Sequence, residues 1–277
     1  MSSYQDLLAK VTGNPEDDAP RLAFASEIRS SEPDRATFIE TQVQQAKSRR
    51  NARDPAILSP KHPLLVKHEL EWGRTFAKYT RSYQFDRGFI TMVEMDPYMF
   101  LEYGEWLFIN APIRTVQFAS PESGAFPMTE LAASPLLEHL DVISFYGPEL
   151  SDGELLDLAQ SPCLKRLQFL ELNNKQETST AVYEAFAAHP ATREMLQFVV
   201  RTLKNFPGQV FADTGRDDMS GAAVEDWSEM RAAGKALENT YGYIPWLHGE
   251  NACEPFDAGY FVANHILPVK APGASVR

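Results

Sequence analysis

A phrase of twelve residues recurs three times in this chain, and it constrains the fold more than any other feature. The copies are SPLLEHLDVISF at 134–145, SPCLKRLQFLEL at 161–172 and HPATREMLQFVV at 189–200. Their prolines are 27 and then 28 residues apart. A repeat of this length marks a stacked architecture, and L-x-x-L-x-L on a short strand is typical of the leucine-rich type. The pattern therefore predicts a solenoid, a fold that works by presenting a surface.

Strand and helix patterns alternate around these copies. Two further strands are expected at 89–95 and 113–118, and the second resembles a shortened copy of the same phrase. Helical apolar spacing separates the strands at 98–109, 128–133, 152–160 and 178–188. We therefore expect an α/β fold: a short, irregular leucine-rich-repeat solenoid with parallel strands on the concave side and helices on the convex side.

The two ends of the chain differ from the repeats in their patterning. Amphipathic helices are expected at 4–11, 17–28, 36–46 and 64–79, and another at 222–237 is followed by an aromatic cluster at 241–247. A stack of repeats needs covers at both ends. The expected division is a helical cap over 1–87, leucine-rich repeats over 88–201, and a C-terminal capping segment over 202–277 whose last residues, 271–277, are disordered.

Several phrases in the first half of the chain resemble a known bacterial domain. They are DDAPRL at 17–22, PDRATFIE at 33–40, ELEW at 69–72 and GF at 88–89. In this order they are similar to the repeat-companion domain that precedes leucine-rich repeats in many bacteria, and the resemblance covers roughly residues 3–200. One departure is FASEI at 24–28, where the family has Y-A-D-W-L. The resemblance implies a bacterial repeat protein with repeats of ribonuclease-inhibitor-like length, and it supplies no catalytic residues.

Charge and composition exclude several classes of partner. The formal net charge of −12 opposes binding to nucleic acid or to an anionic membrane. The small basic group Lys47, Arg49, Arg50 and Arg53 fits a solvated helix end better than a nucleic-acid site. Two cysteines, no signal-peptide pattern and no apolar run of about 18 residues favour a cytoplasmic protein, with signal-independent export left open.

Sequence motifs for cofactor or phosphate binding are absent. The chain has no G-x-G-x-x-G, no G-x-x-x-x-G-K-[ST], no H-E-x-x-H and no G-x-S-x-G. The segment 213–218 resembles a calcium loop, but Asp218 replaces the required glycine and Val224 replaces the final glutamate. We expect no cofactor.

Isolated histidines and cysteines give a weak indication of a metal site or a nucleophile. His248, Glu250 and Cys253 resemble the first part of a zinc-deaminase motif, but the later P-C-x-x-C is missing. Cys163 is expected to be a small buried packing residue. His139 and His189 lie at repeat junctions, where surface or packing roles are expected. No metal site is predicted.

The strand register predicts which side chains face outward on the concave wall. They are Met92, Glu94, Asp96, Thr115, Gln117, Ala119, Val142, Ser144, Tyr146, Phe169, Glu171, Asn173, Gln197, Val199 and Arg201. Within this set Val142, Phe169 and Tyr146 form an apolar patch with a polar rim, which suits a protein interface. As an alternative, the patch is covered by the aromatic cluster at 241–247 or by a second copy of the chain.

The function that these observations favour is a non-enzymatic protein–protein interaction module. A role in bacterial immunity or defence, or as a regulatory binding protein, is a narrower hypothesis, because an acidic surface can mask a basic active site. Two alternatives stay open. One is an enzyme whose site lies in the C-terminal segment around His248, Glu250 and Cys253. The other is a structural element that assembles with copies of itself.

Overall fold

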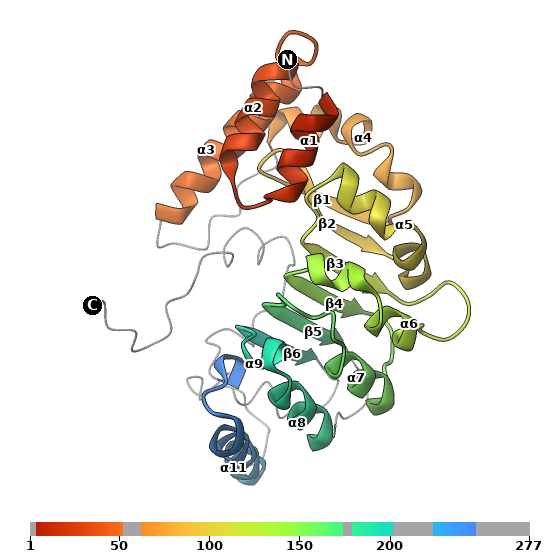
Figure 1. The fold of residues 1–277 in the computed structure, drawn as a ribbon, viewed down its shortest axis with the longest axis vertical. Helices are drawn as coiled ribbons and strands as arrows, with labels where there is room; N and C mark the ends of the chain where they lie inside the picture. Colours follow the sequence, from red (N-terminus) through yellow and green to blue (C-terminus); the bar gives the residue numbers. More distant parts are fainter. Residues whose placement is uncertain (1–3, 52–61, 174–178, 202–223, 248–277) are drawn as a thin grey trace. The chain divides into compact units, whose positions relative to one another are not determined.

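The computed structural model describes residues 4–51, 62–173, 179–201 and 224–247. It is an α/β protein whose strands follow the order β1-β2-β3-β4-β5-β6 in a mostly parallel sheet (Figure 1). The chain divides into two compact units. Unit 1 contains the described residues up to Met95 together with Glu102–Thr115, and unit 2 contains Asp96–Leu101 and the described residues from Val116 onward.

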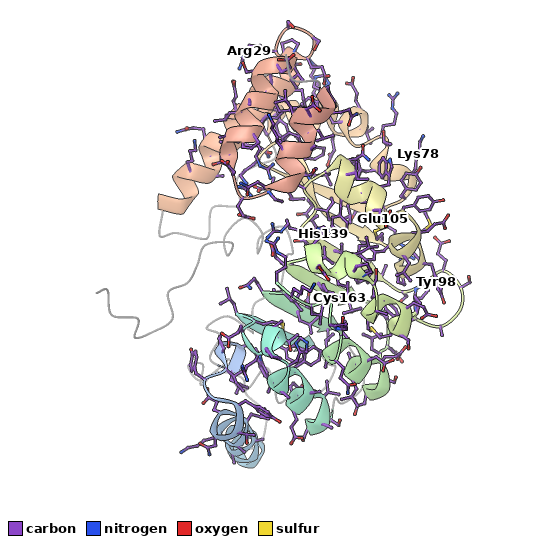
Figure 2. The ribbon with its side chains drawn as sticks, in the orientation of Figure 1. Arg29, Lys78, Tyr98, Glu105, His139 and Cys163 are labelled. Atoms are coloured by element: carbon purple, nitrogen blue, oxygen red, sulfur yellow. The ribbon has the colours of Figure 1, made fainter. Side chains whose placement is uncertain are left out.

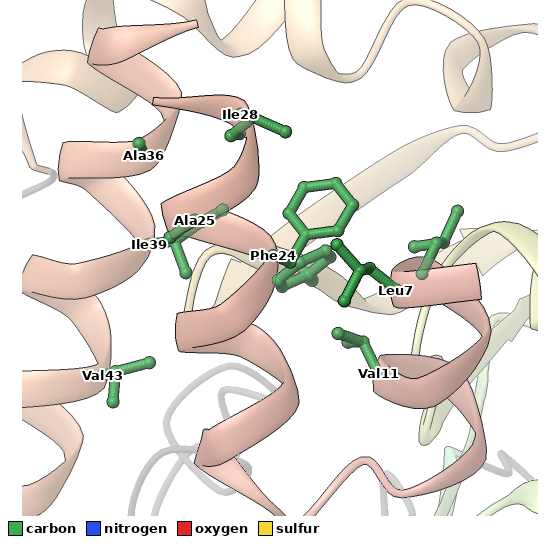
Figure 3. Packing of buried hydrophobic residues seen from close by; sticks show 10 residues of the cluster. Leu7, Val11, Phe24, Ala25, Ile28, Ala36, Ile39 and Val43 are labelled. Atoms are coloured by element: carbon green, nitrogen blue, oxygen red, sulfur yellow. The ribbon is translucent and has the colours of Figure 1, made fainter. Parts of the chain in front are cut away.

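Three helices form the first part of unit 1, as the sequence predicted. They are α1 (Tyr4–Gly13), α2 (Asp18–Ile28) and α3 (Pro33–Asn51). Their apolar faces meet in one cluster with Phe89, shown in Figure 3: Leu7, Leu8, Val11, Phe24, Ala25, Ile28, Ala36, Ile39 and Val43. The ring of Phe24 lies edge-on to that of Phe89 at 5.2 Å. Burial of these side chains, each contributing about 1.5 to 3 kcal/mol for the large ones, holds the three helices together.

The fourth predicted helix, over 64–79, is wrong in its length. Helix α4 (Pro63–Trp72) ends at Gly73, and a short 3₁₀ turn, η1 (Phe76–Lys78), follows. The end of the helix lies against Tyr83: a Cβ atom at Gly73 would lie 2.0 Å from Cζ of Tyr83. The Tyr83 hydroxyl also donates to the carbonyl oxygen of Glu69 at 3.2 Å. The tyrosine ring therefore packs against the end of α4 at a position where only glycine fits.

A β-hairpin that the sequence patterns did not predict follows η1. Strand β1 (Ser82–Asp86) pairs antiparallel with β2 (Phe89–Met95). Arg87 and Gly88 form the connection with φ angles of 45° and 85°, the positive values that a tight hairpin turn needs. The Gly88 position cannot accept a side chain, because a Cβ there would lie 2.4 Å from Cγ1 of Ile39. Helix α5 (Pro97–Asn110) follows β2.

Unit 2 repeats a strand–helix unit in step with the sequence phrase. Its elements are β3 (Thr115–Ala119), α6 (Met128–Ala132), η2 (Pro135–His139), β4 (Val142–Tyr146), α7 (Asp152–Ala159), β5 (Phe169–Asn173), α8 (Thr180–Ala188), α9 (Pro190–Arg193) and β6 (Gln197–Arg201). Strands β4, β5 and β6 are parallel neighbours. Figure 1 shows α7 and α8 on one face of these strands.

The predicted register of the repeats is confirmed for these three strands. Ile143 pairs with Leu170, and Leu170 pairs with Phe198, so equivalent positions of successive copies meet across the sheet. The ring of Phe118 stacks on that of Phe145 at 5.5 Å, and these residues hold equivalent positions in the shortened copy and the first full copy. Phenylalanine side chains at equivalent positions of these two copies therefore stack on one another in the core.

The C-terminal described segment covers the apolar end of unit 2. Helix α11 (Val224–Tyr241) contacts α8, and the turn η3 (Pro245–Leu247) contacts β6. Trp246 is 3% exposed, and its ring lies edge-on to Phe198 at 5.4 Å. The aromatic cluster at 241–247 therefore belongs to the folded structure, as its apolar character predicted, although Tyr243 remains 51% exposed.

Among the helices described, none combines the length and hydropathy needed to cross a lipid bilayer.

Candidate functional site

The side chains predicted to face outward from the strands are for the most part buried. The contact of Phe198 with Phe186 shows that its row faces helix α8, so the alternate row, which includes Val142 and Phe169, points the opposite way. We call this alternate row the second face. Seven of the predicted residues are at most 5% exposed: Met92, Thr115, Ala119, Val142, Ser144, Phe169 and Glu171. Asp96, Glu94 and Gln117 are partly buried.

The prediction of an exposed apolar patch at Val142 and Phe169 is wrong. The two residues are direct partners across β4 and β5, as the register required, but they are 1% and 0% exposed. The side chains of Tyr146, Asn173, Gln197, Val199 and Arg201 lie outside the described part of the structure. A binding role for the second face therefore stays a prediction that rests on residues other than this pair.

The strand sequences explain why this face is buried. VISF in β4 and FLEL in β5 are apolar at nearly every position, which is typical of parallel strands covered on both sides. Partners on neighbouring strands also stand only about 4.8 Å apart and cover one another. One polar pair of this face is internally bonded: the Ser144 hydroxyl donates to Glu171 at 2.8 Å, and both groups are buried.

The isolated histidine and cysteine candidates do not form a site among the described residues. Cys163 is 8% exposed, with its sulfur 3.8 Å from the Ala133 carbonyl oxygen (Figure 2), in agreement with a packing role. His139 is exposed at the end of η2 (Figure 2). Burial lowers the pKa of His189, which precedes α9. No cluster of three metal-ligating side chains occurs in the described ranges.

Two further candidates fall outside the described residues. These are the calcium-like segment 213–218 and the zinc-like group of His248, Glu250 and Cys253.

The resemblance motif DDAPRL has a structural role in unit 1. Asp17 caps α2 by accepting from the backbone N–H of Ala19 at 2.9 Å. Asp18 pairs with Arg87 at 3.3 Å. Arg21 is fully buried and donates to the carbonyl oxygens of Pro15 at 2.9 Å and Arg87 at 3.3 Å. Burial lowers the pKa of Arg21 to about 10, so the guanidinium stays charged at neutral pH.

A second arginine of the motifs lies among aromatic rings. The Cζ atom of Arg35 lies 4.6 Å from the ring centroid of Trp72 and 5.2 Å from that of Phe85. Such cation–π contacts stabilise a charge that burial would otherwise disfavour. Burial nevertheless lowers the pKa of Arg35 to about 10. The two motif arginines thus tie α2 and α3 to the hairpin, a structural role.

An acidic surface on the helices of unit 2 was missed by the sequence patterns. Helices α6, α7 and α8 contact one another in chain order and contain no lysine, arginine or histidine. They carry five carboxylates: Glu130, Asp152, Glu154, Asp157 and Glu184. We call this set the acidic helix face. A count of charge along the chain would have found it, because no lysine or arginine occurs between Arg114 and Lys165.

The carboxylates of the acidic helix face differ in their hydrogen bonds and in their exposure to solvent. Glu154 forms a capping box with Ser151, where it also complements the positive end of the α7 dipole. Asp157 accepts from the Thr129 hydroxyl at 2.8 Å, which joins α7 to α6. Glu130 and Glu184 are exposed. Asp157 is exposed as well, so these three side chains present their charge to solvent.

Comparison of the chain with known protein families, with curated proteins and with solved structures found no match. The resemblance to the repeat-companion domain therefore stays a prediction from the motifs.

Proposed function

We propose that this chain is a non-enzymatic protein-binding module of the leucine-rich-repeat type, with a solenoid in unit 2. The observation that carries the proposal is the register of β4, β5 and β6. Ile143, Leu170 and Phe198 pair in sequence, one repeat apart each time. Units that stack in this way bury a continuous core and leave extended surfaces for partners.

The acidic helix face is the surface that best suits a partner. Glu130 and Glu184 are exposed on helices that hold no basic residue, and the whole chain carries a net charge of −12. A surface of one sign steers and selects partners of the opposite sign. The partner is therefore a protein with a basic surface.

This chemistry supports a narrower role in neutralising a basic protein. Masking a cationic active site, such as that of a toxin which acts on nucleic acid, requires a protein surface rich in carboxylates. A bacterial immunity, defence or regulatory binding protein fits this description. Because Val142 and Phe169 of the second face are buried, we place the proposed binding surface on the helices and not on the strands.

The end of unit 2 favours binding over self-assembly. Trp246 lies against Phe198, and η3 contacts β6, which is the last strand of the sheet. An uncovered edge strand would offer its backbone to another copy. The contact of η3 with β6 therefore limits pairing of this strand with a second copy of the chain.

The test is affinity capture from cells of the native host with two double variants as baits. Glu130→Lys with Glu184→Lys reverses charge on the acidic helix face. The control, Glu27→Lys with Glu105→Lys, makes the same change in net charge at exposed positions of unit 1. We expect partners with basic surfaces to be retained by the wild type and the control and to be lost from the first variant. Retention should also fall as salt is raised, since the Debye length shrinks from about 10 Å at 0.1 M to about 3 Å at 1 M.

Recovery of the same proteins by all three baits would exclude the acidic helix face as the binding surface. Equal loss from both double variants would mean that only the overall charge matters.

A further inference from the structure

One histidine, His68 on α4, joins two helices of unit 1. Its Nε2 atom lies 2.8 Å from Oδ2 of Asp34 on α3, and its Nδ1 atom lies 3.0 Å from Oε2 of Glu71 on α4. The His68 side chain is 19% exposed. Both ring nitrogens thus face carboxylates at hydrogen-bond distance.

The two carboxylate contacts favour the imidazolium, the doubly protonated form of the His68 ring. A neutral imidazole has one N–H, so it can donate to only one of the two carboxylates and would turn a lone pair toward the other. The imidazolium has two N–H groups and can donate to both. Both carboxylates raise the pKa of His68, with Glu71 the larger cause, while desolvation by burial and the neighbouring Lys67 oppose them.

Aromatic packing extends the contact into the interior. The imidazole ring stacks on Trp72 at 4.9 Å with 15° between the planes, and Trp72 stacks on Phe38 of α3 at 5.0 Å. Arg35 lies over the same indole. A cationic ring is attracted to an indole face, so protonation strengthens this stack as well.

We infer that His68 is a pH-sensitive clasp, which as an imidazolium ties α4 to the first turn of α3 and on losing a proton weakens that tie. The charged groups around it are Asp34 and Arg35 from α3 and Lys67 and Glu71 from α4. Lys67 also bonds Asp34, at 2.9 Å, so the aspartate keeps a cationic partner when the histidine is neutral. The clasp therefore loosens and does not open fully.

The direction of the pH dependence follows from the two shifts. The folded pKa of His68 lies above its ordinary value of 6.5, so the histidine stabilises the fold fully below 6.5 and loses this effect as pH rises through the folded pKa. The folded pKa of Asp34 lies below 3.8, chiefly because Lys67 and His68 bond it. Its contribution is present above 3.8 and is lost as pH falls through that lower pKa.

The direct test is NMR titration of the histidine rings in the full chain. We expect His68 to titrate above 6.5 in the wild type. Asp34→Asn and Glu71→Gln should each lower that value, while substitution of the exposed Glu105 on α5, Glu105→Gln, should leave it unchanged, because Glu105 is not among the groups that shift the pKa of His68. A wild-type value at or below 6.5, or a value that neither substitution lowers, would overturn the inference.

Hydrogen exchange provides a second readout that reports the helix itself. After correction for the intrinsic rate, protection of the α4 amides should fall between pH 6 and pH 9 in the wild type. His68→Gln should show weaker protection at pH 6 and no comparable loss on raising the pH. Equal pH dependence in both proteins would show that the histidine is not the sensor.

Discussion

Ile143 on β4 and Leu170 on β5 are cross-strand partners, although a full repeat separates them in the sequence. Both side chains are fully buried. The repeat period thus brings equivalent residues of successive copies into contact, and each copy covers the apolar row of the copy before it. The stability of unit 2 should therefore depend strongly on this row.

Leu170→Ala tests that dependence. Removing a fully buried leucine side chain leaves a cavity between neighbouring strands and should lower the free energy of unfolding by about 2 to 5 kcal/mol. Urea denaturation followed by circular dichroism measures the loss. Leu70→Ala is the matched control, because Leu70 on α4 is 85% exposed and should change stability by less than about 0.5 kcal/mol. Similar losses in the two variants would contradict the assignment of the core.

Gly73→Ala tests the close packing of Tyr83 against the end of α4. The new Cβ would meet the ring of Tyr83 at 2.0 Å, so we expect a loss of about 1 to 3 kcal/mol despite the higher helix propensity of alanine. Gly13→Ala is the control, because no atom lies within 4 Å of a Cβ at that position. In the double variant Gly73→Ala with Tyr83→Ala, the loss should be smaller than the sum of the single losses. Strict additivity would mean that the clash with the ring does not cause the loss.

Arg21→Lys tests the structural role of the DDAPRL motif. Arg21 reaches two carbonyl oxygens on separate segments, and an ammonium group cannot reproduce that fork. We expect a loss of about 1 to 3 kcal/mol in the free energy of unfolding. Arg29→Lys, at a half-exposed position that pairs with Glu40, should cost at most about 1 kcal/mol. If Arg21→Lys proved as mild as the control, a role for the motif outside the fold would have to be considered.

Trp246→Ala tests the cover over the last strand. The indole is buried against Phe198, and its loss should destabilise the protein by about 3 to 5 kcal/mol. Protection of the β6 amides against hydrogen exchange should fall in the same variant. Tyr243→Ala, which removes a side chain that is 51% exposed, serves as the comparison. Unchanged protection in β6 would show that η3 does not hold that strand.

Much of the local structure could be predicted because it depends on contacts near in sequence. The start of α2 follows from Asp17, whose side chain bonds a backbone N–H two residues away. The strand registers follow from the repeat, since a period shared by successive strands aligns equivalent residues. The charge of the acidic helix face was also present in the sequence, but residue-by-residue motif searching does not detect the absence of basic residues.

The hairpin of β1 and β2 illustrates what local patterns miss. Arg87 has a positive φ angle, which non-glycine residues seldom adopt. The contacts of its side chain and its carbonyl group offset the cost of this conformation. Its guanidinium bonds Asp18, far away in the sequence, and its carbonyl oxygen accepts from Arg21. No turn preference of the dipeptide itself indicates these partners.

The α/β class, the period of the repeat and the register of β4 to β6 could be predicted from the amino-acid sequence, because they depend on the spacing of apolar residues along one chain. Three features became visible only in the folded protein: Tyr83 packs against Gly73, Val142 and Phe169 are buried, and His68 meets two carboxylates. Each of these depends on a neighbour brought in from a distant segment. The residue types at such positions are compatible with several environments, and the packed fold selects one.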